Sequence, residues 1–230
     1  MKKASVKREM VVNAPLNQVW DALTKPEHLN QWYTKSAEID FRIGGRGYMN
    51  HGWGATSDGV FTEIEDMKRF VLQSPDGSFT TITTLEKVDK GVLVSIEYQG
   101  SFLGEISQAA QENMLFGTGQ FLENLKSVYE IGVDLRPSLW KASIGIAHTT
   151  NKEGLGTSVL KVKEGSVAAA AGIEPEDIIE EIDGETITGY ESFERALNSK
   201  TVNRDIILTI GRKNKKLQIN CLVDSYPVPY

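Results

Sequence analysis

Three histidines are the side chains best suited to acid–base chemistry near neutral pH in this chain of 230 residues. His51 stands out, because alternation along a predicted strand puts it on the same face as Met49 and Trp53. If that face lines a cavity, a desolvated His51 could act as a general base or as a polar anchor. A solvent-facing or simply hydrogen-bonded histidine is the commoner arrangement. His51 is therefore the one catalytic candidate, and it has a structural alternative.

The motifs that would complete an active site are absent from the sequence. It contains no G-x-S-x-G, no H-E-x-x-H, no phosphate-binding loop and no C-x-x-C. His28 follows Pro26 in a predicted helix and is expected at the surface. The sequence therefore favours a binding protein over an enzyme, and it predicts neither a cofactor nor a metal site.

Composition limits the classes of partner. The net charge is −6 and the sequence pI is about 5.2, which argues against nucleic acid or an anionic membrane as a partner. The single cysteine, Cys221, excludes an internal disulfide and fits a reducing compartment. No apolar run of about 18 residues and no apolar leader segment is present, so we expect a cytoplasmic protein without membrane insertion.

The segment from Gly165 to Leu197 is rich in structural signals. Small residues from Ala168 to Ala171 predict a short helix that Gly172 ends with a positive φ. Asp183-Gly184 predicts a hairpin turn. The flanking apolar positions fit a strand before that turn and a helix after it: Ile178, Ile179, Ile182, Tyr190, Phe193, Ala196 and Leu197. This order resembles the central part of a bacterial PDZ domain, like those of HtrA proteases. The resemblance implies capture of peptide C-termini as an added strand.

The same resemblance implies a carboxylate-binding loop upstream. Ser143, Ile144, Gly145 and Ile146 match the family pattern of an apolar-Gly-apolar triplet. In that pattern consecutive backbone N–H groups converge on a carboxylate, although a buried strand with a bulge has the same residues. His148 is expected to border the peptide groove. The groove helix is expected to present Tyr190, Glu194 and Leu197 to the peptide, with Phe193 facing the core.

The first 133 residues follow a different pattern. The sequence predicts a strand over Val6–Asn13, helices over Asn17–Leu23 and Pro26–Tyr33, and a long closing helix around Phe116 to Val128. Between them Ile39, Phe41 and Ile43 alternate with polar neighbours, as in a strand. Five further strands are expected, at residues 48–53, 60–66, 68–73, 78–88 and 92–99.

This order resembles the START-like, or SRPBCC, superfamily, and within it the activators of the heat-shock-protein-ninety ATPase. The resemblance is carried by VNAPLNQVWDAL, HLNQW, FRIGGRG and GQFLENLKSVY, which begin at Val12, His28, Phe41 and Gly119. It implies a helix-grip fold, in which a curved sheet wraps the closing helix around an apolar cavity. The predicted lining is Trp32, Met49, Trp53, Phe70, Leu72, Ile82, Ile96 and Phe121. Ordinary core packing explains the same residues equally well.

We therefore expect an α+β chain: a helix-grip domain at residues 1–133, a linker at 134–141, a PDZ domain at 142–224 built as a β-sandwich or partly open barrel with two helices, and a tail at 225–230. The expected function is a non-enzymatic adaptor that binds peptide C-termini and a small apolar ligand or partner protein. A co-chaperone-type regulator of an ATPase and an enzyme acting on a small apolar molecule are the alternatives. The tail ends in Val228, Pro229 and Tyr230. It is a candidate ligand for the groove of another copy, which would cause self-association.

Overall fold

The computed structural model of the chain describes residues 4–52, 54–100 and 107–226. These residues form two compact units. Unit 1 contains residues 4–100 together with Met114–Pro137. Unit 2 contains Ser107–Asn113 and the residues from Ser138 onward. Trp53 and residues 227–230, which carry two of the predictions above, lie outside the described part.

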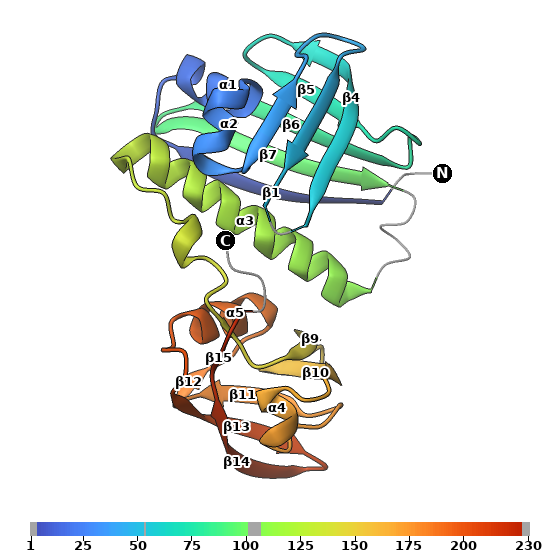
Figure 1. Cartoon of the computed structure of the whole chain (residues 1–230). Helices are drawn as coiled ribbons and strands as arrows, with labels where there is room; N and C mark the ends of the chain where they lie inside the picture. The colour runs from blue at the N-terminus through green and yellow to red at the C-terminus, as the bar shows by residue number, and fades with distance from the viewer. Residues whose placement is uncertain (1–3, 53, 101–106, 227–230) are drawn as a thin grey trace. The chain divides into compact units, whose positions relative to one another are not determined.

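Unit 1 is built on a seven-stranded antiparallel sheet in the order β1-β7-β6-β5-β4-β3-β2 (Figure 1). Three helices accompany it. The first two are separated at Pro26, which lacks the N–H that a continuing helix needs and instead starts the second helix. The strands are β1 (Ala4–Val12), β2 (Ser36–Ile39), β3 (Arg46–Asn50), β4 (Thr56–Glu65), β5 (Arg69–Gln73), β6 (Phe79–Val88) and β7 (Gly91–Gly100). The helices are α1 (Leu16–Thr24), α2 (Pro26–Trp32) and α3 (Gln108–Ile131), and residues 108–113 of α3 belong to unit 2.

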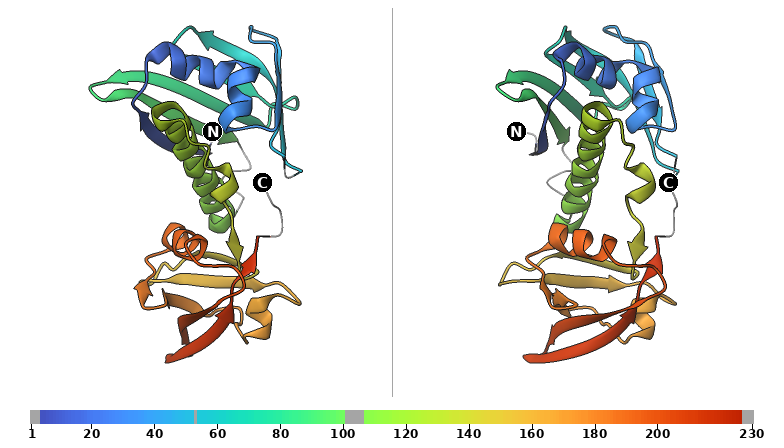
Figure 2. Two further views of the ribbon diagram at one scale, coloured as in Figure 1. Left: turned by 60° about the vertical axis from the view of Figure 1, so that its left-hand side comes forward. Right: turned by 90° about the vertical axis from the view of Figure 1, so that its left-hand side faces the viewer.

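The helices of unit 1 cover one face of the sheet, as Figure 2 shows. On β5 the side chains of Phe70 and Leu72 share that face, and the Trp20 ring of α1 meets Phe70 edge-on at 5.8 Å between ring centroids. On β7 the Tyr98 hydroxyl lies 2.9 Å from the Thr118 hydroxyl of α3. A curved antiparallel sheet that holds a long helix is the predicted helix-grip arrangement, so the α+β fold class is confirmed.

The strand predicted through Phe41 and Ile43 is wrong. β2 ends at Ile39, and a turn follows in which Gly44 has φ +80°. Phe41 still faces inward, with its ring 5.0 Å from that of Phe61, but Ile43 is 65% exposed. Ile39 and Phe41 have the spacing of a strand, but only Ile39 belongs to β2. The chain already turns at Asp40, whose carbonyl accepts from the Arg42 N–H at 2.8 Å, so the alternation ends before Ile43.

Unit 2 contains a sheet with the strand order β14-β13-β11-β10-β9, with β12 paired to β11. A separate pair joins β8 to β15. The apolar core of unit 2 includes Ile144, Ile179, Phe193 and Leu208. The elements are β8 (Ala142–Ser143), β9 (Ile146–Thr150), β10 (Thr157–Val162), α4 (Val167–Ala170), β11 (Ile178–Ile182), β12 (Glu185–Thr186), α5 (Tyr190–Asn198), β13 (Asp205–Arg212), β14 (Lys215–Leu222) and β15 (Asp224–Ser225).

Several local predictions for unit 2 are confirmed. The helix α4 is followed by Gly172 at φ +79°. Asp183 and Gly184 both have positive φ, at 51° and 81°, as a two-residue hairpin turn between β11 and β12 requires. Cys221 is 1% exposed, and burial raises the pKa of its thiol to about 11, which fits a small buried hydrophobe.

The end of unit 1 lies beyond residue 133. The Arg136 guanidinium donates to the Thr34 carbonyl at 3.0 Å and to two carbonyls near the end of α2. Asn124 of α3 accepts a hydrogen bond from the Leu135 backbone N–H at 2.6 Å. The first residues of the predicted 134–141 linker are therefore held within unit 1, because the guanidinium and the amide satisfy backbone groups there.

Candidate functional site

The predicted carboxylate loop is the turn between β8 and β9. Gly145 has φ +81°, and a Cβ at this position would lie only 2.4 Å from the Ser166 Cβ, so glycine is required. The Ile144 carbonyl accepts from the Ala168 N–H of α4 at 3.0 Å, and the Gly145 carbonyl accepts from the Lys163 N–H at 2.9 Å. Both loop carbonyls are thereby engaged by other parts of unit 2.

The strand β9, which follows this loop, lies at the end of its sheet. The Asn151 N–H donates to the Gly156 carbonyl, and the Thr149 carbonyl accepts from the Thr157 hydroxyl of β10. The backbone groups of Thr149 and Asn151 therefore point toward β10. Backbone groups alternate in direction along a strand, so those of Ile146, His148 and Thr150 point away from β10. β9 therefore offers an open edge on the side where α5 lies.

Helix α5 forms the opposite wall. Tyr190, Phe193 and Leu197 are buried, and Phe193 and Leu197 belong to the apolar core of unit 2. Glu194 lies between them, with its side chain 16% exposed.

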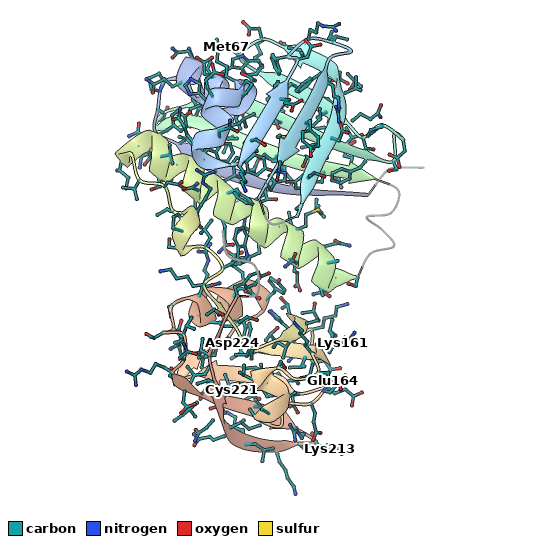
Figure 3. The ribbon with its side chains drawn as sticks, viewed as in Figure 1. Met67, Lys161, Glu164, Lys213, Cys221 and Asp224 are labelled. Atoms are coloured by element: carbon teal, nitrogen blue, oxygen red, sulfur yellow. The ribbon has the colours of Figure 1, made fainter. Side chains whose placement is uncertain are left out.

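A cavity of about 1010 Å³ lies between β9 and α5, and we call it the groove. The structure brings all eight predicted peptide-binding residues to its lining: Ser143, Ile144, Gly145, Ile146, His148, Tyr190, Glu194 and Leu197. The lining also includes residues that the sequence did not indicate. Lys161 and Glu164, labelled in Figure 3, come from β10 and the turn after it, and Tyr226 follows β15.

His148 is held by a short hydrogen-bond chain under the groove. The Thr157 hydroxyl donates to the Thr149 carbonyl at 2.8 Å, so it accepts from His148 Nδ1 at 2.7 Å. His148 Nε2 lies 2.9 Å from Glu194 Oε1. The ring also stacks on Tyr190, with 4.3 Å between centroids. These contacts orient the ring, with Nδ1 toward the Thr157 hydroxyl and Nε2 toward the Glu194 carboxyl.

Two tyrosines lie near the Glu194 charge. Burial and then the negative charge of Glu194 raise the pKa of both Tyr190 and Tyr226. Tyr226 is placed by its backbone N–H, which donates to the Lys141 carbonyl at 3.0 Å. The sequence analysis placed Tyr226 in the tail at 225–230. The pairing of β15 with β8, which precedes Tyr226, depends on contacts distant along the chain and could not be predicted. The groove therefore combines a carboxylate with two phenol rings.

The first turns of α3, which belong to unit 2, lie at one end of the groove. Glu112 Oε2 accepts from the Thr149 hydroxyl at 2.7 Å and from the Thr150 N–H at 3.1 Å. Asn113 donates to the Tyr190 hydroxyl at 2.9 Å. No sequence signal marked these two residues, since they lie far along the chain from both walls.

The residues predicted to line a cavity in unit 1 divide between the two faces of the sheet. Met49, Phe70, Leu72 and Ile96 share the face that the helices cover. Ile82 pairs with Val71 and lies on the opposite face. Trp32 and Phe121 are buried on α2 and α3, and Trp53 lies outside the described residues.

His51 is buried but does not lie on a strand with Met49, because β3 ends at Asn50. Its Nε2 is 2.9 Å from the Ser57 hydroxyl, and its ring lies 4.6 Å from that of Tyr33. Burial lowers the pKa of His51, and a hydrogen bond to the Tyr33 backbone offsets this only in part. The ring is therefore neutral at pH 7 and hydrogen-bonded to a hydroxyl.

Within residues 4–52, 54–100 and 107–226, no three His, Cys, Asp or Glu side chains gather in a way that could hold a metal ion. In the same ranges, no helix has the length and apolar character needed to cross a membrane.

A helix-grip unit and a second unit with an edge-strand groove define a two-domain binding protein. The family model described as Activator of Hsp90 ATPase homolog 1-like protein matches residues 13–130, more than half of the chain, and a PDZ domain model matches residues 142–223. The chain belongs to the Activator of Hsp90 ATPase homolog 1-like family and carries a PDZ domain. These domain types support a binding or adaptor role.

Parts of the chain are also similar to solved structures. The Aha1 dimer from Colwellia psychrerythraea is 18% identical, with 56% of this chain and 98% of that chain covered and a TM-score of 0.47. A protein from Bacillus halodurans is 21% identical, with 56% and 99% covered and a TM-score of 0.48. A protein from Nitrosomonas europaea is 22% identical, with 55% and 94% covered and a TM-score of 0.46. No curated protein sequence matches the chain.

Proposed function

We propose that the groove binds the free C-terminus of an extended peptide, which adds to β9 as a further antiparallel strand. The observation that carries this proposal is the open edge of β9, which starts directly at the loop containing Gly145. An edge strand supplies unpaired backbone groups for a ligand strand. The loop N–H groups of Ile144, Gly145 and Ile146 would receive the terminal carboxylate, and the Gly145 N–H would exchange the Ser143 hydroxyl, to which it donates at 3.1 Å, for the ligand.

The alternation of β9 sets the register of such a ligand. With the carboxylate on the loop, the terminal residue lies beside Ile146. The residue two places before it then exchanges hydrogen bonds with His148, and the carbonyl four places before it points at the Thr150 N–H. The bonds to Ile146 and His148 would be made by the ligand backbone. Sequence preference therefore comes from the walls of the groove.

Substitution of Gly145 tests the loop. Gly145→Val places a branched side chain at φ +81° and against Ser166, so we expect peptide binding to fall by about a hundredfold or more. Gly172→Ala is the matched control: its φ of +79° carries similar backbone strain, but nothing lies within 4 Å of the added Cβ. Isothermal titration with a peptide from a C-terminal display library measures both variants. Equal affinity of Gly145→Val and Gly172→Ala would contradict the loop's role.

Glu194 is proposed to select the ligand residue two places before the end. Its carboxylate lies beside His148 and near two phenol rings, an environment that suits a basic or hydroxyl side chain. A peptide series with lysine, threonine or glutamate at that position should bind in this order, with glutamate weakest. Glu194→Gln should reduce the difference between lysine and glutamate by roughly three- to tenfold. Identical affinities for the three peptides would remove the claim.

For unit 1 we propose binding of a small apolar ligand at the face covered by the helices, or of a partner protein at the outer surface. Met49, Phe70, Leu72 and Ile96 share that face, which supports an apolar interior. Native mass spectrometry of the purified full chain tests the first option, since a bound molecule adds a defined mass. A mass equal to that of the polypeptide, with the interior filled by side chains in a crystal structure, would contradict it.

Regulation of a partner ATPase is the second candidate, and the match of residues 13–130 to a family named for activation of the Hsp90 ATPase favours it. The test is ATP hydrolysis by purified Hsp90 with and without the full chain. A severalfold increase supports this function. An unchanged rate, together with a co-purified small molecule, favours ligand binding.

A further inference from the structure

The far end of the groove is closed by two neighbouring residues of unit 2. Glu112 takes hydrogen bonds from β9, through the Thr149 hydroxyl and the Thr150 N–H. Asn113 donates to Tyr190, the first residue of α5. Together they join the two walls at the end opposite to the loop that contains Gly145.

Glu112 is held as a carboxylate. Burial by itself would raise its pKa, but hydrogen bonds from Thr150, Thr149 and Gln108 outweigh burial and lower the pKa below its ordinary value. Hydrogen bonds that stabilise the charged form are stronger than neutral ones. The hydrogen bonds from β9 to the Glu112 carboxylate are therefore present at neutral pH.

The hydrogen bond from Thr150 matters because a ligand strand would need the same N–H. In the register set by β9, Ile146 and His148 serve the last residues of the ligand, and Thr150 would receive the carbonyl four places before the end. One N–H cannot serve the Glu112 carboxylate and this carbonyl in full at the same time. The strand edge open to a ligand thus ends after His148.

We propose that Glu112 and Asn113 set the length of peptide that the groove reads, limiting it to the last four residues. This inference rests on the proposed binding of C-terminal peptides, and it defines the ligand class as short free C-termini. Residues further upstream in a partner protein then contribute no strand pairing to the affinity.

A length series on the full chain tests the inference. The probes are N-acetylated peptides with the free C-terminal sequence Lys-Ala-Val, as the tripeptide or extended by alanine to a tetrapeptide or a hexapeptide. The acetyl carbonyl takes the place of one further residue, so the carbonyl for Thr150 first appears in the tetrapeptide. We expect the natural chain to bind all three with equal affinity. Glu112→Ala should bind the tetrapeptide about three- to tenfold tighter than the tripeptide, the effect of one added hydrogen bond.

The controls separate this inference from the proposed function. Glu185→Ala removes an exposed carboxylate elsewhere in unit 2 and should behave as the natural chain does. Thr149→Val removes one of the hydrogen bonds that hold Glu112 and should show a smaller gain than Glu112→Ala. Equal length dependence in the natural chain and in Glu112→Ala would overturn the inference and leave peptide binding intact. Absence of binding for all peptides and variants would overturn the proposed function, and the inference with it.

Discussion

The two units expose their sheets in different ways. In unit 1 the helices cover one face of the sheet, and large side chains such as Trp20 and Phe70 meet there. In unit 2 the end strand β9 keeps the backbone groups of Ile146 and His148 turned toward a groove. A covered face recognises a ligand through the volume left between side chains, whereas an open edge recognises one through its backbone. The comparison supports the proposal that unit 2 recognises peptides.

The buried histidines show the same contrast. His51 in unit 1 and His148 in unit 2 are 5% and 4% exposed, and each bonds to a hydroxyl. His148 also faces the Glu194 carboxylate, at 2.9 Å from Nε2. His51 therefore serves the interior of unit 1, while His148 connects the sheet to the charged wall of the groove.

The largest expected effect is a loss of stability in unit 1 when a large side chain is removed from between its helices and its sheet. Trp32 is 1% exposed, and its indole N–H donates to the Ala22 carbonyl at 2.9 Å, which joins α2 to α1. Trp32→Ala should lower the free energy of unfolding of unit 1 by about 3–5 kcal/mol. Hydrogen-exchange mass spectrometry in denaturant should show the loss in segments of unit 1, with unit 2 unchanged. Equal loss in both units would break the comparison.

A smaller effect is expected at the hydroxyls beside the two histidines. Thr157 is fully buried, so Thr157→Val leaves His148 Nδ1 without an acceptor at a cost of about 1–3 kcal/mol in unit 2. Ser57 is half-buried, and water can replace its hydroxyl beside His51. Ser57→Ala should therefore lower the free energy of unfolding of unit 1 by about 1 kcal/mol or less. Hydrogen exchange in each unit measures both, and a larger cost for Ser57→Ala would contradict the contrast.

The smallest effect concerns pH. Burial lowers the pKa of His51 below its ordinary value of 6.5, so below pH 6.5 the unfolded chain takes up a proton more readily than the folded one. Unit 1 should lose stability as the pH falls from 7 toward 5.5, by at most about 1.4 kcal/mol per pH unit from this group. His51→Gln should reduce that loss. An unchanged pH dependence in His51→Gln would show that His51 is not the cause.

Sequence reasoning succeeded where a local signal fixes the backbone. Gly172 has the positive φ that its type and neighbours predict, and Asp183-Gly184 has the backbone of the predicted hairpin turn. The groove lining predicted from the PDZ pattern came together for the same reason, because each residue occupies a defined position on a short element. The resemblance to the PDZ family, rather than local chemistry alone, indicated this part of the site.

Sequence reasoning failed where the outcome depends on contacts distant along the chain. Ile43 continued an alternating pattern, yet the turn after β2 exposes it. Ile82 has the apolar character of its neighbours, and only the register of β5 with β6 shows that it faces the other side. Glu112 and Tyr226 reach the groove through tertiary contacts that leave no mark in the sequence around them.

The most direct test of peptide recognition through the β9 edge compares one peptide in two forms. The full chain is titrated with a peptide selected by C-terminal display, first with its free carboxylate and then with an amidated end. The account predicts that amidation weakens binding by about a hundredfold or more, because the carboxylate loses its charge-assisted hydrogen bonds to the loop that contains Gly145. Equal affinity of the two forms would contradict it.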